Sequence, residues 1–169
     1  MSRLLSLSNR LKTEVRYELL TSSQLAALHD LEKAWTFPER INLWGSSGAG
    51  KTFLGWVMVT RTSPSVHHVS PEAFMESDKI DNEALHVIDN ASTDPNALRR
   101  LIAEMQLRNI RTSLIISPTA NLIGLPSIHL PAPTMGDITA VYNTLNKLEQ
   151  YALIPRQEGN LWQIIHSVL

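Results

Sequence analysis

Residues 45–52 read Gly45-Ser46-Ser47-Gly48-Ala49-Gly50-Lys51-Thr52 and match every position of the phosphate-binding pattern G-x-x-x-x-G-K-[ST]. An apolar run at 41–44 precedes them and another at 53–59 follows, so the pattern lies where a buried strand passes into a buried helix. Glycines let successive backbone N–H groups turn toward phosphate oxygens at the positive end of that helix. Lys51 would add a point charge, and Thr52 would offer a hydroxyl to Mg²⁺. The stretch therefore predicts a phosphate-binding loop.

The overall composition limits the kinds of partner. The 169 residues are enough for one domain with a well-packed core. Lys and Arg total 15 against 16 for Asp and Glu, so contact with nucleic acid or an anionic membrane would need a local basic patch. Cysteine is absent, which excludes disulfides, thiol catalysis and cysteine-based metal sites. No signal peptide and no apolar run of membrane-spanning length is visible, so we expect a cytoplasmic protein without membrane contact.

Strand and helix patterns alternate along the chain. Short apolar runs of strand type lie at about 40–44, 66–69, 84–90, 113–117 and 127–130. Helical patterns lie at about 22–35, after Lys51, briefly after Ser70, after Asp94, and from 134 to about 151. The stretch from Thr21 to Gln24 resembles a capping box for the first of these helices, and Asp94 followed by a proline is typical of a helix start. Such alternation predicts an α/β fold of the P-loop NTPase kind, a three-layer sandwich with a central parallel five-stranded sheet. The nucleotide would lie at the carboxyl ends of the strands.

The sequence divides into three parts. Residues 1–20 form a basic N-terminal arm with four basic residues against two acids, and it is either a solvated segment or a contact for nucleic acid or a partner. Residues 21–131 form the P-loop nucleotide-binding core. Residues 132–169 form a reduced, mostly helical, lid-like segment, which begins with a capping-box pattern at Thr134 and Asp137. Its end, 152–169, fits a helix or a hairpin, and we favour the helix.

An acid closes the third predicted strand. Asp89 follows the apolar run Leu85-His86-Val87-Ile88, and downstream of a phosphate loop this position predicts the carboxylate that holds Mg²⁺ together with Thr52. The pair Asn146-Lys147 could suggest guanine recognition, but it falls within a predicted helix, and the sequence after Asp89 lacks the glycine of a GTPase switch. The expected ligands are therefore ATP or ADP with Mg²⁺.

Three arginines, Arg99, Arg100 and Arg108, lie away from the apolar stripe of the helix that begins near Asp94. A solvated basic face is one interpretation of them. The other is a contact with a phosphate backbone or a partner. Together with the basic N-terminus, they are the places where DNA could bind, although the balanced net charge does not strongly indicate DNA contact.

These features together resemble the AAA+ ATPases of the DnaA type, including the Hda-like regulators and the helicase loaders. The resemblance covers roughly residues 22–130 and is carried by the helix before the first strand, the phosphate loop, and three phrases at 67–74, 87–90 and 114–117. It implies ATP binding, head-to-tail assembly, and control of DNA replication or a related DNA transaction. It also implies that Asp89 is the Mg²⁺ acid and that Ser117 matches the polar sensor at the end of the fourth strand.

The chain departs from this family at two points. Asn90 stands where many hydrolytic members have a glutamate, and an amide can orient water but cannot accept its proton. No Lys or Arg occurs between Arg111 and Lys147, the region from which the family's arginine finger would come. Arg156 is the sole candidate for the lid's nucleotide-sensing arginine. We therefore expect slow ATP hydrolysis at most, or hydrolysis that depends on a partner.

Three functions fit this sequence. The first is an ATP- or ADP-binding AAA+-like regulator or adaptor in a DNA transaction such as replication initiation, working with a partner ATPase or DNA-bound complex and using Lys51, Asp89, Asn90 and Ser117 for weak hydrolysis. The second is a phosphotransferase of the nucleotide-kinase kind, which would need arginines to clamp a second phosphorylated substrate. The third is a degenerate P-loop subunit with a structural role in a larger assembly.

Overall fold

The computed structural model of the chain describes residues 17–34, 39–61, 66–78, 80–120 and 124–149. Its elements in chain order are η1 (Tyr17–Leu19), α2 (Ser22–Ala34), β1 (Arg40–Trp44), α3 (Lys51–Arg61), β2 (Val66–Val69), α4 (Pro71–Glu76), β3 (Leu85–Ile88), α5 (Pro95–Leu107), β4 (Ser113–Ser117), β5 (Ser127–His129) and α6 (Met135–Glu149). The five expected strands and the helices expected between residues 22 and 151 are present, with ends that differ by one or two residues.

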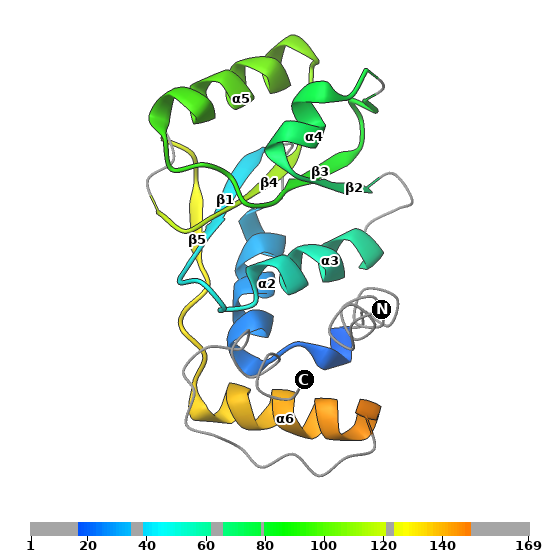
Figure 1. The fold of residues 1–169 in the computed structure, drawn as a ribbon, viewed down its shortest axis with the longest axis vertical. Helices are drawn as coiled ribbons and strands as arrows, with labels where there is room; N and C mark the ends of the chain where they lie inside the picture. The colour runs from blue at the N-terminus through cyan, green and yellow to red at the C-terminus, as the bar shows by residue number, and fades with distance from the viewer. Residues whose placement is uncertain (1–16, 35–38, 62–65, 79, 121–123, 150–169) are drawn as a thin grey trace.

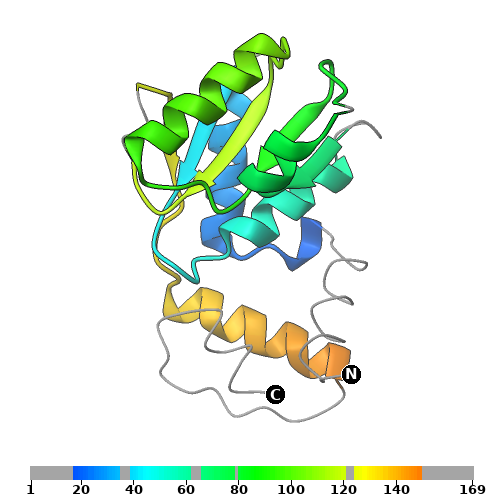
Figure 2. The same ribbon diagram turned by 45° about the horizontal axis from the view of Figure 1, so that its top comes forward.

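The strands form one sheet in the order β2-β3-β4-β1-β5, and every neighbouring pair is parallel. Helices α2 and α3 cover one face of this sheet, and α4 and α5 cover the other (Figures 1 and 2). The prediction of an α/β three-layer sandwich around a parallel five-stranded sheet is therefore confirmed. Parallel pairing also brings the carboxyl ends of all five strands to one edge, where the phosphate loop leaves β1.

Alternate residues of the central strands supply two apolar layers. Leu43 of β1 and Ile116 of β4 belong to the cluster that packs against α2 and α3. Ile115 of β4 and Ile88 of β3 belong to the cluster that packs against α4 and α5, where Phe74 is also buried. Successive side chains of a strand point to opposite faces, so a strand that is buried on both sides is mostly apolar in sequence, and Asn42 of β1 and His86 of β3 are the buried polar exceptions in these two strands.

Hydrogen-bonding side chains fix the helix starts as the sequence predicts. The Thr21 hydroxyl accepts from the Gln24 N–H at 3.3 Å, and Gln24 Oε1 accepts from the Thr21 N–H at 2.9 Å, which is the reciprocal capping box. Ser70 caps α4 and Asp94 caps α5, each followed by a proline at the first helical position. These bonds satisfy N–H groups that have no partner within a helix.

Helix α6 lies at one end of the molecule, beyond α2 and α3 as seen from the sheet (Figure 1). Ile138 and Tyr142 are buried, so this helix packs an apolar side against the rest of the structure. The predicted helix or hairpin at 152–169, with Arg156, and the basic residues of the arm at 1–16 lie outside the described residues. Among the described helices, none has both the length and the apolar character needed to cross a membrane.

Candidate nucleotide-binding site

The phosphate loop connects β1 to α3, and α3 begins at Lys51. Gly48 and Gly50 have positive φ angles of 75° and 91°, which glycine adopts far more readily than other residues. Gly45 is needed for another reason, because a Cβ atom there would lie 2.2 Å from the carbonyl oxygen of Leu130. The glycines of the motif thus serve backbone turns and one close approach, as expected of a loop that wraps around an anion.

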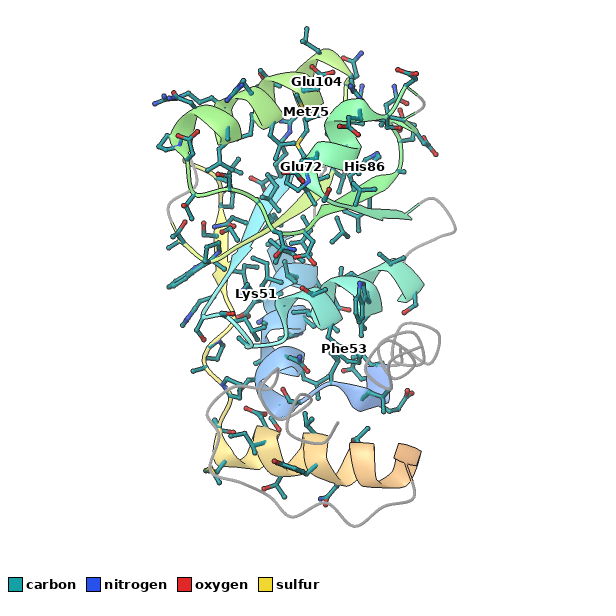
Figure 3. All side chains as sticks on the ribbon, in the orientation of Figure 1. Lys51, Phe53, Glu72, Met75, His86 and Glu104 are labelled. Atoms are coloured by element: carbon teal, nitrogen blue, oxygen red, sulfur yellow. The ribbon has the colours of Figure 1, made fainter. Side chains whose placement is uncertain are left out.

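The Lys51 ammonium lies inside the loop. Its Nζ donates to the carbonyl oxygens of Gly45 and Ser46, both at 2.8 Å. Burial lowers the pKa of Lys51, and the nearby Asp89 carboxylate acts in the opposite direction. Figure 3 shows Lys51 where the loop enters α3. A phosphate bound in the loop would give this ammonium an anionic partner in place of two neutral carbonyls, which is a stronger interaction.

Asp89 lies at the carboxyl end of β3, on the same edge of the sheet as the loop. It is 6% exposed, its N–H donates to the Val69 carbonyl at 2.9 Å, and its Oδ1 accepts from the Asn90 N–H at 2.9 Å. The negative charge of Asp89 acts to raise the pKa of Lys51, so the two side chains lie near enough for their charges to interact. This is the arrangement that the sequence predicts for a carboxylate near bound phosphates.

The donors at this edge fit Mg²⁺. Asp89 supplies a carboxylate, and Thr52 supplies a hydroxyl from the first turn of α3. The described residues contain no group of three or more His, Asp or Glu side chains that could hold a metal by themselves. Mg²⁺ commonly uses one or two protein oxygens and completes its shell with water and substrate phosphates, so a sparse donor set of this kind suits it.

Asn90 adopts the left-handed conformation, with φ of 59°, and is exposed. Asparagine is among the few residues other than glycine that adopt this region at low cost. The left-handed backbone is therefore one reason for asparagine at position 90, separate from any role of its amide with water. Whether its amide orients an attacking water stays a prediction.

Ser117 ends β4 and is buried, with 1% exposure. Its Oγ lies 2.8 Å from Asn42 Oδ1 and 2.8 Å from the Thr119 carbonyl oxygen. Asn42 in turn donates to the carbonyls of Thr119 and Ala120 at 2.8 and 3.1 Å. These hydrogen bonds order the loop after β4 and do not join Ser117 to Lys51 or Asp89. A nucleotide-sensing role for Ser117 thus stays a prediction.

The Arg108 side chain is held by interactions within the protein. Its guanidinium donates to the carbonyls of Phe74, Ser77 and Met75 at the end of α4, pairs with Glu104, and lies over the Phe74 ring. Of the three arginines considered for DNA contact, Arg99 and Arg100 are exposed and Arg108 is partly buried. Figure 3 shows Glu104 and Met75 on the α4 and α5 side of the sheet, away from Lys51.

Two residues that support the loop were not expected from the sequence. Gln24 Nε2 donates to the Gly50 carbonyl at 3.3 Å, although the sequence indicates only a capping role for Gln24. Leu130 is fully buried, its carbonyl faces Gly45, and its N–H donates to the Trp44 carbonyl at 2.8 Å. A capping box at the start of the helix that precedes β1 is the only sequence signal for the first. Nothing in the local pattern indicates the second.

No protein-family model and no curated protein matches this sequence. Solved structures do match the fold. The replication initiator DnaA bound to AMPPCP and single-stranded DNA superposes with a TM-score of 0.59 at 13% identity, over 92% of this chain and 65% of that chain. The Thermotoga maritima RuvB Holliday junction branch migration motor gives 0.56 at 15% identity, over 90% and 60%.

A third solved structure, Brucella abortus NtrX in complex with ADP, gives a TM-score of 0.59 at 17% identity, over 97% of this chain and 53% of that one. The chain therefore spans between about half and two thirds of the length of these neighbours. At such low identities the similarity concerns the fold. This chain shares the P-loop α/β fold of these three solved structures.

Proposed function

We propose that this chain is an ATP- or ADP-binding regulator or adaptor that acts in a DNA transaction such as replication initiation. The observation that carries the proposal is the convergence of Lys51 and Asp89 at the carboxyl edge of the sheet, beside a loop whose glycines have the required conformations. Asp89 is a buried carboxylate whose charge interacts with the half-buried ammonium of Lys51, and such pairs are typical of functional sites. Lys51 would bind the phosphates, and Asp89 with Thr52 would hold Mg²⁺.

Slow or partner-dependent hydrolysis follows from two features. Asn90 is a poor proton acceptor where a general base is needed. The sequence from 112 to 146 contains no Lys or Arg that could stabilise the charge of the transition state in a neighbouring subunit. A partner that supplies an arginine would therefore be expected to accelerate turnover, while this chain by itself would mostly hold the nucleotide.

The setting in a DNA transaction is supported by the neighbours in fold, among which are a replication initiator bound to single-stranded DNA and a Holliday junction motor. Two of the neighbours hold AMPPCP or ADP. The phosphotransferase alternative has less support, because Arg99 and Arg100 are exposed on α5 and Arg108 is bonded to α4. The preserved Lys51 and Asp89 pair argues against a degenerate site.

The test is nucleotide binding by calorimetry, for the wild type, Lys51→Ala and the control Lys33→Ala. Lys33 is an exposed lysine in the last turn of α2, so its removal changes the net charge equally without touching the loop. We expect the wild type and Lys33→Ala to bind ATP and ADP, and Lys51→Ala to bind neither tightly. Phosphate release is measured with and without DNA. A wild type that binds neither nucleotide would overturn the proposal.

A further inference from the structure

The first turn of α2 lies between the phosphate loop and α6. Gln24, which is 2% exposed, faces the loop with its side-chain amide, and Nε2 donates to the Gly50 carbonyl at 3.3 Å. Its Oε1 accepts from the Thr21 N–H at 2.9 Å, so both ends of the amide are held. Gly50 is the last glycine before Lys51, and its carbonyl also accepts from Leu54 N–H in α3.

Ser23, the preceding residue, faces the other way. Its Oγ donates to Asp137 Oδ2 at 2.6 Å, and its N–H donates to Oδ1 of the same carboxylate at 3.3 Å. Asp137 also caps α6, because its Oδ2 accepts from the N–H and the hydroxyl of Thr134, each at 2.9 Å. One buried carboxylate therefore joins the starts of two helices. Burial by itself would raise the pKa of Asp137, but these hydrogen bonds outweigh it and lower the pKa to about 2.

A second connection runs along the backbone. The carbonyl of Leu130 faces Gly45 at a distance that excludes any side chain there, and Leu130 directly follows β5 on the way to α6. The first glycine of the loop thus lies against the start of the segment that leads to α6, and the last glycine is bonded to the turn that holds α6. Both ends of the loop are linked to the placement of this helix.

We propose that Ser23 and Gln24 are positioning residues that couple the phosphate loop to helix α6, so that nucleotide in the loop and the position of α6 influence each other. This inference rests on the proposed nucleotide binding. Adjacent residues of one helical turn move together, so a displacement of Gly50 when phosphate binds is passed to Asp137. The sequence from 112 to 155 contains no arginine that could link α6 to the nucleotide directly. By linkage, a change that frees α6 must also alter nucleotide affinity.

The test follows α6 with a fluorophore on Ala140→Cys, an exposed position in a chain that has no other cysteine. The coupling variants are Asp137→Asn, which leaves one acceptor oxygen for several donors, and Gln24→Met, which removes the amide that binds Gly50. Ser23→Thr keeps the hydroxyl and serves as the conservative rescue. Thr21→Val is the control, because it removes a capping bond from the same turn and leaves both coupling contacts in place.

In the wild type we expect ATP to change the fluorophore emission. Asp137→Asn and Gln24→Met should lose most of that response and bind ATP about fivefold more weakly or worse. Ser23→Thr should keep both properties, and Thr21→Val should lose thermal stability while keeping the response. If the wild type binds ATP but its fluorophore emission does not change, the proposed coupling is wrong and the proposal of nucleotide binding stands. The same conclusion follows if the emission of the coupling variants changes as much as that of the wild type. If the wild type binds no nucleotide, both proposals fail.

Discussion

The carbonyl oxygen of Leu130 lies 2.2 Å from the place that a Cβ atom on Gly45 would occupy. Gly45→Ala must therefore move either the backbone after β5 or the phosphate loop itself, since neither atom belongs to a flexible side chain. We expect this variant to be less stable by about 1–3 kcal/mol and to bind ATP weakly. Calorimetry and chemical unfolding would measure the two effects.

Gly136→Ala is the matched control for that substitution. Its Cβ would meet only the Thr134 hydroxyl, at an ordinary contact distance of 3.6 Å, and Gly136 lies within α6. Alanine in a helix should raise stability by about 0.5–1 kcal/mol relative to glycine. Equal behaviour of the two alanine variants would contradict the role given to the contact between Gly45 and Leu130.

Asp89→Asn should separate binding of nucleotide from binding of Mg²⁺. The amide is a poor ligand for this ion, so the variant should bind ATP with an affinity that no longer depends on Mg²⁺, whereas wild-type affinity should rise when Mg²⁺ is added. Loss of the negative charge should also lower the pKa of Lys51 further, because Asp89 now opposes the effect of burial. Titration of ATP binding with and without Mg²⁺ checks the first point. Unchanged Mg²⁺ dependence would place the ion elsewhere.

Asn90→Glu tests whether a missing carboxylate limits hydrolysis. The left-handed backbone at this position should make glutamate less stable than asparagine by about 1 kcal/mol, while Asn90→Gly should be tolerated. If the base is limiting, Asn90→Glu raises phosphate release and Asn90→Gly does not. An unchanged rate in a variant that still folds and binds ATP would indicate that the absent arginine, or the position of the water, is limiting.

Asp137 should make stability depend on acid pH. Its pKa is about 2 in the folded chain against an ordinary value of 3.8, so the ionised group stabilises the folded state above the ordinary value, and this stabilisation disappears as the pH falls through the folded value. The difference corresponds to about 2 kcal/mol. Urea unfolding of the wild type and Asp137→Asn should therefore differ most near neutral pH and converge toward pH about 2. A constant difference would rule out the ionised carboxylate as its source.

Arg108→Ala should destabilise the protein without affecting nucleotide. The guanidinium holds three carbonyls at the end of α4, so its loss should cost about 1–3 kcal/mol of unfolding free energy. Arg100→Ala, at an exposed position of α5, should be nearly neutral for stability. Thermal unfolding and DNA binding are measured for both. A loss of DNA affinity in Arg108→Ala with unchanged stability would show that this side chain works at the surface after all.

Local patterns sufficed to predict most of the fold. The apolar runs predicted the strands, and the capping residues predicted the starts of α2, α4, α5 and α6. The loop motif predicted which edge of the sheet would bind nucleotide. Each of these signals lies within a few neighbouring residues. The place of Asp89 at the end of β3 was predictable from the apolar run before it, and its role with Mg²⁺ stays a prediction.

The remaining features depend on contacts between segments far apart in the chain. Ser117 matches a sensor position in the sequence, yet its hydroxyl contacts Asn42, 75 residues away. Arg108 resembles a surface arginine until α4, 31 residues earlier, is placed beside it. The bond between Ser23 and Asp137 spans 114 residues. The periodicity of apolar residues indicates which face of a helix or strand is buried. It does not indicate which polar group from a distant segment will bind a given side chain.

The shared carboxylate of Asp137 gives α6 a pivot. Both hydrogen bonds from Ser23 end on this one side chain, at the very start of the helix, so a turn of α6 about that point would keep these two bonds, and its cost would be the packing of the buried Ile138 and Tyr142. A sliding movement along the helix axis would break both bonds at once. Motion of this segment should accordingly be a swing whose amplitude grows from Asp137 toward the carboxyl end of the helix.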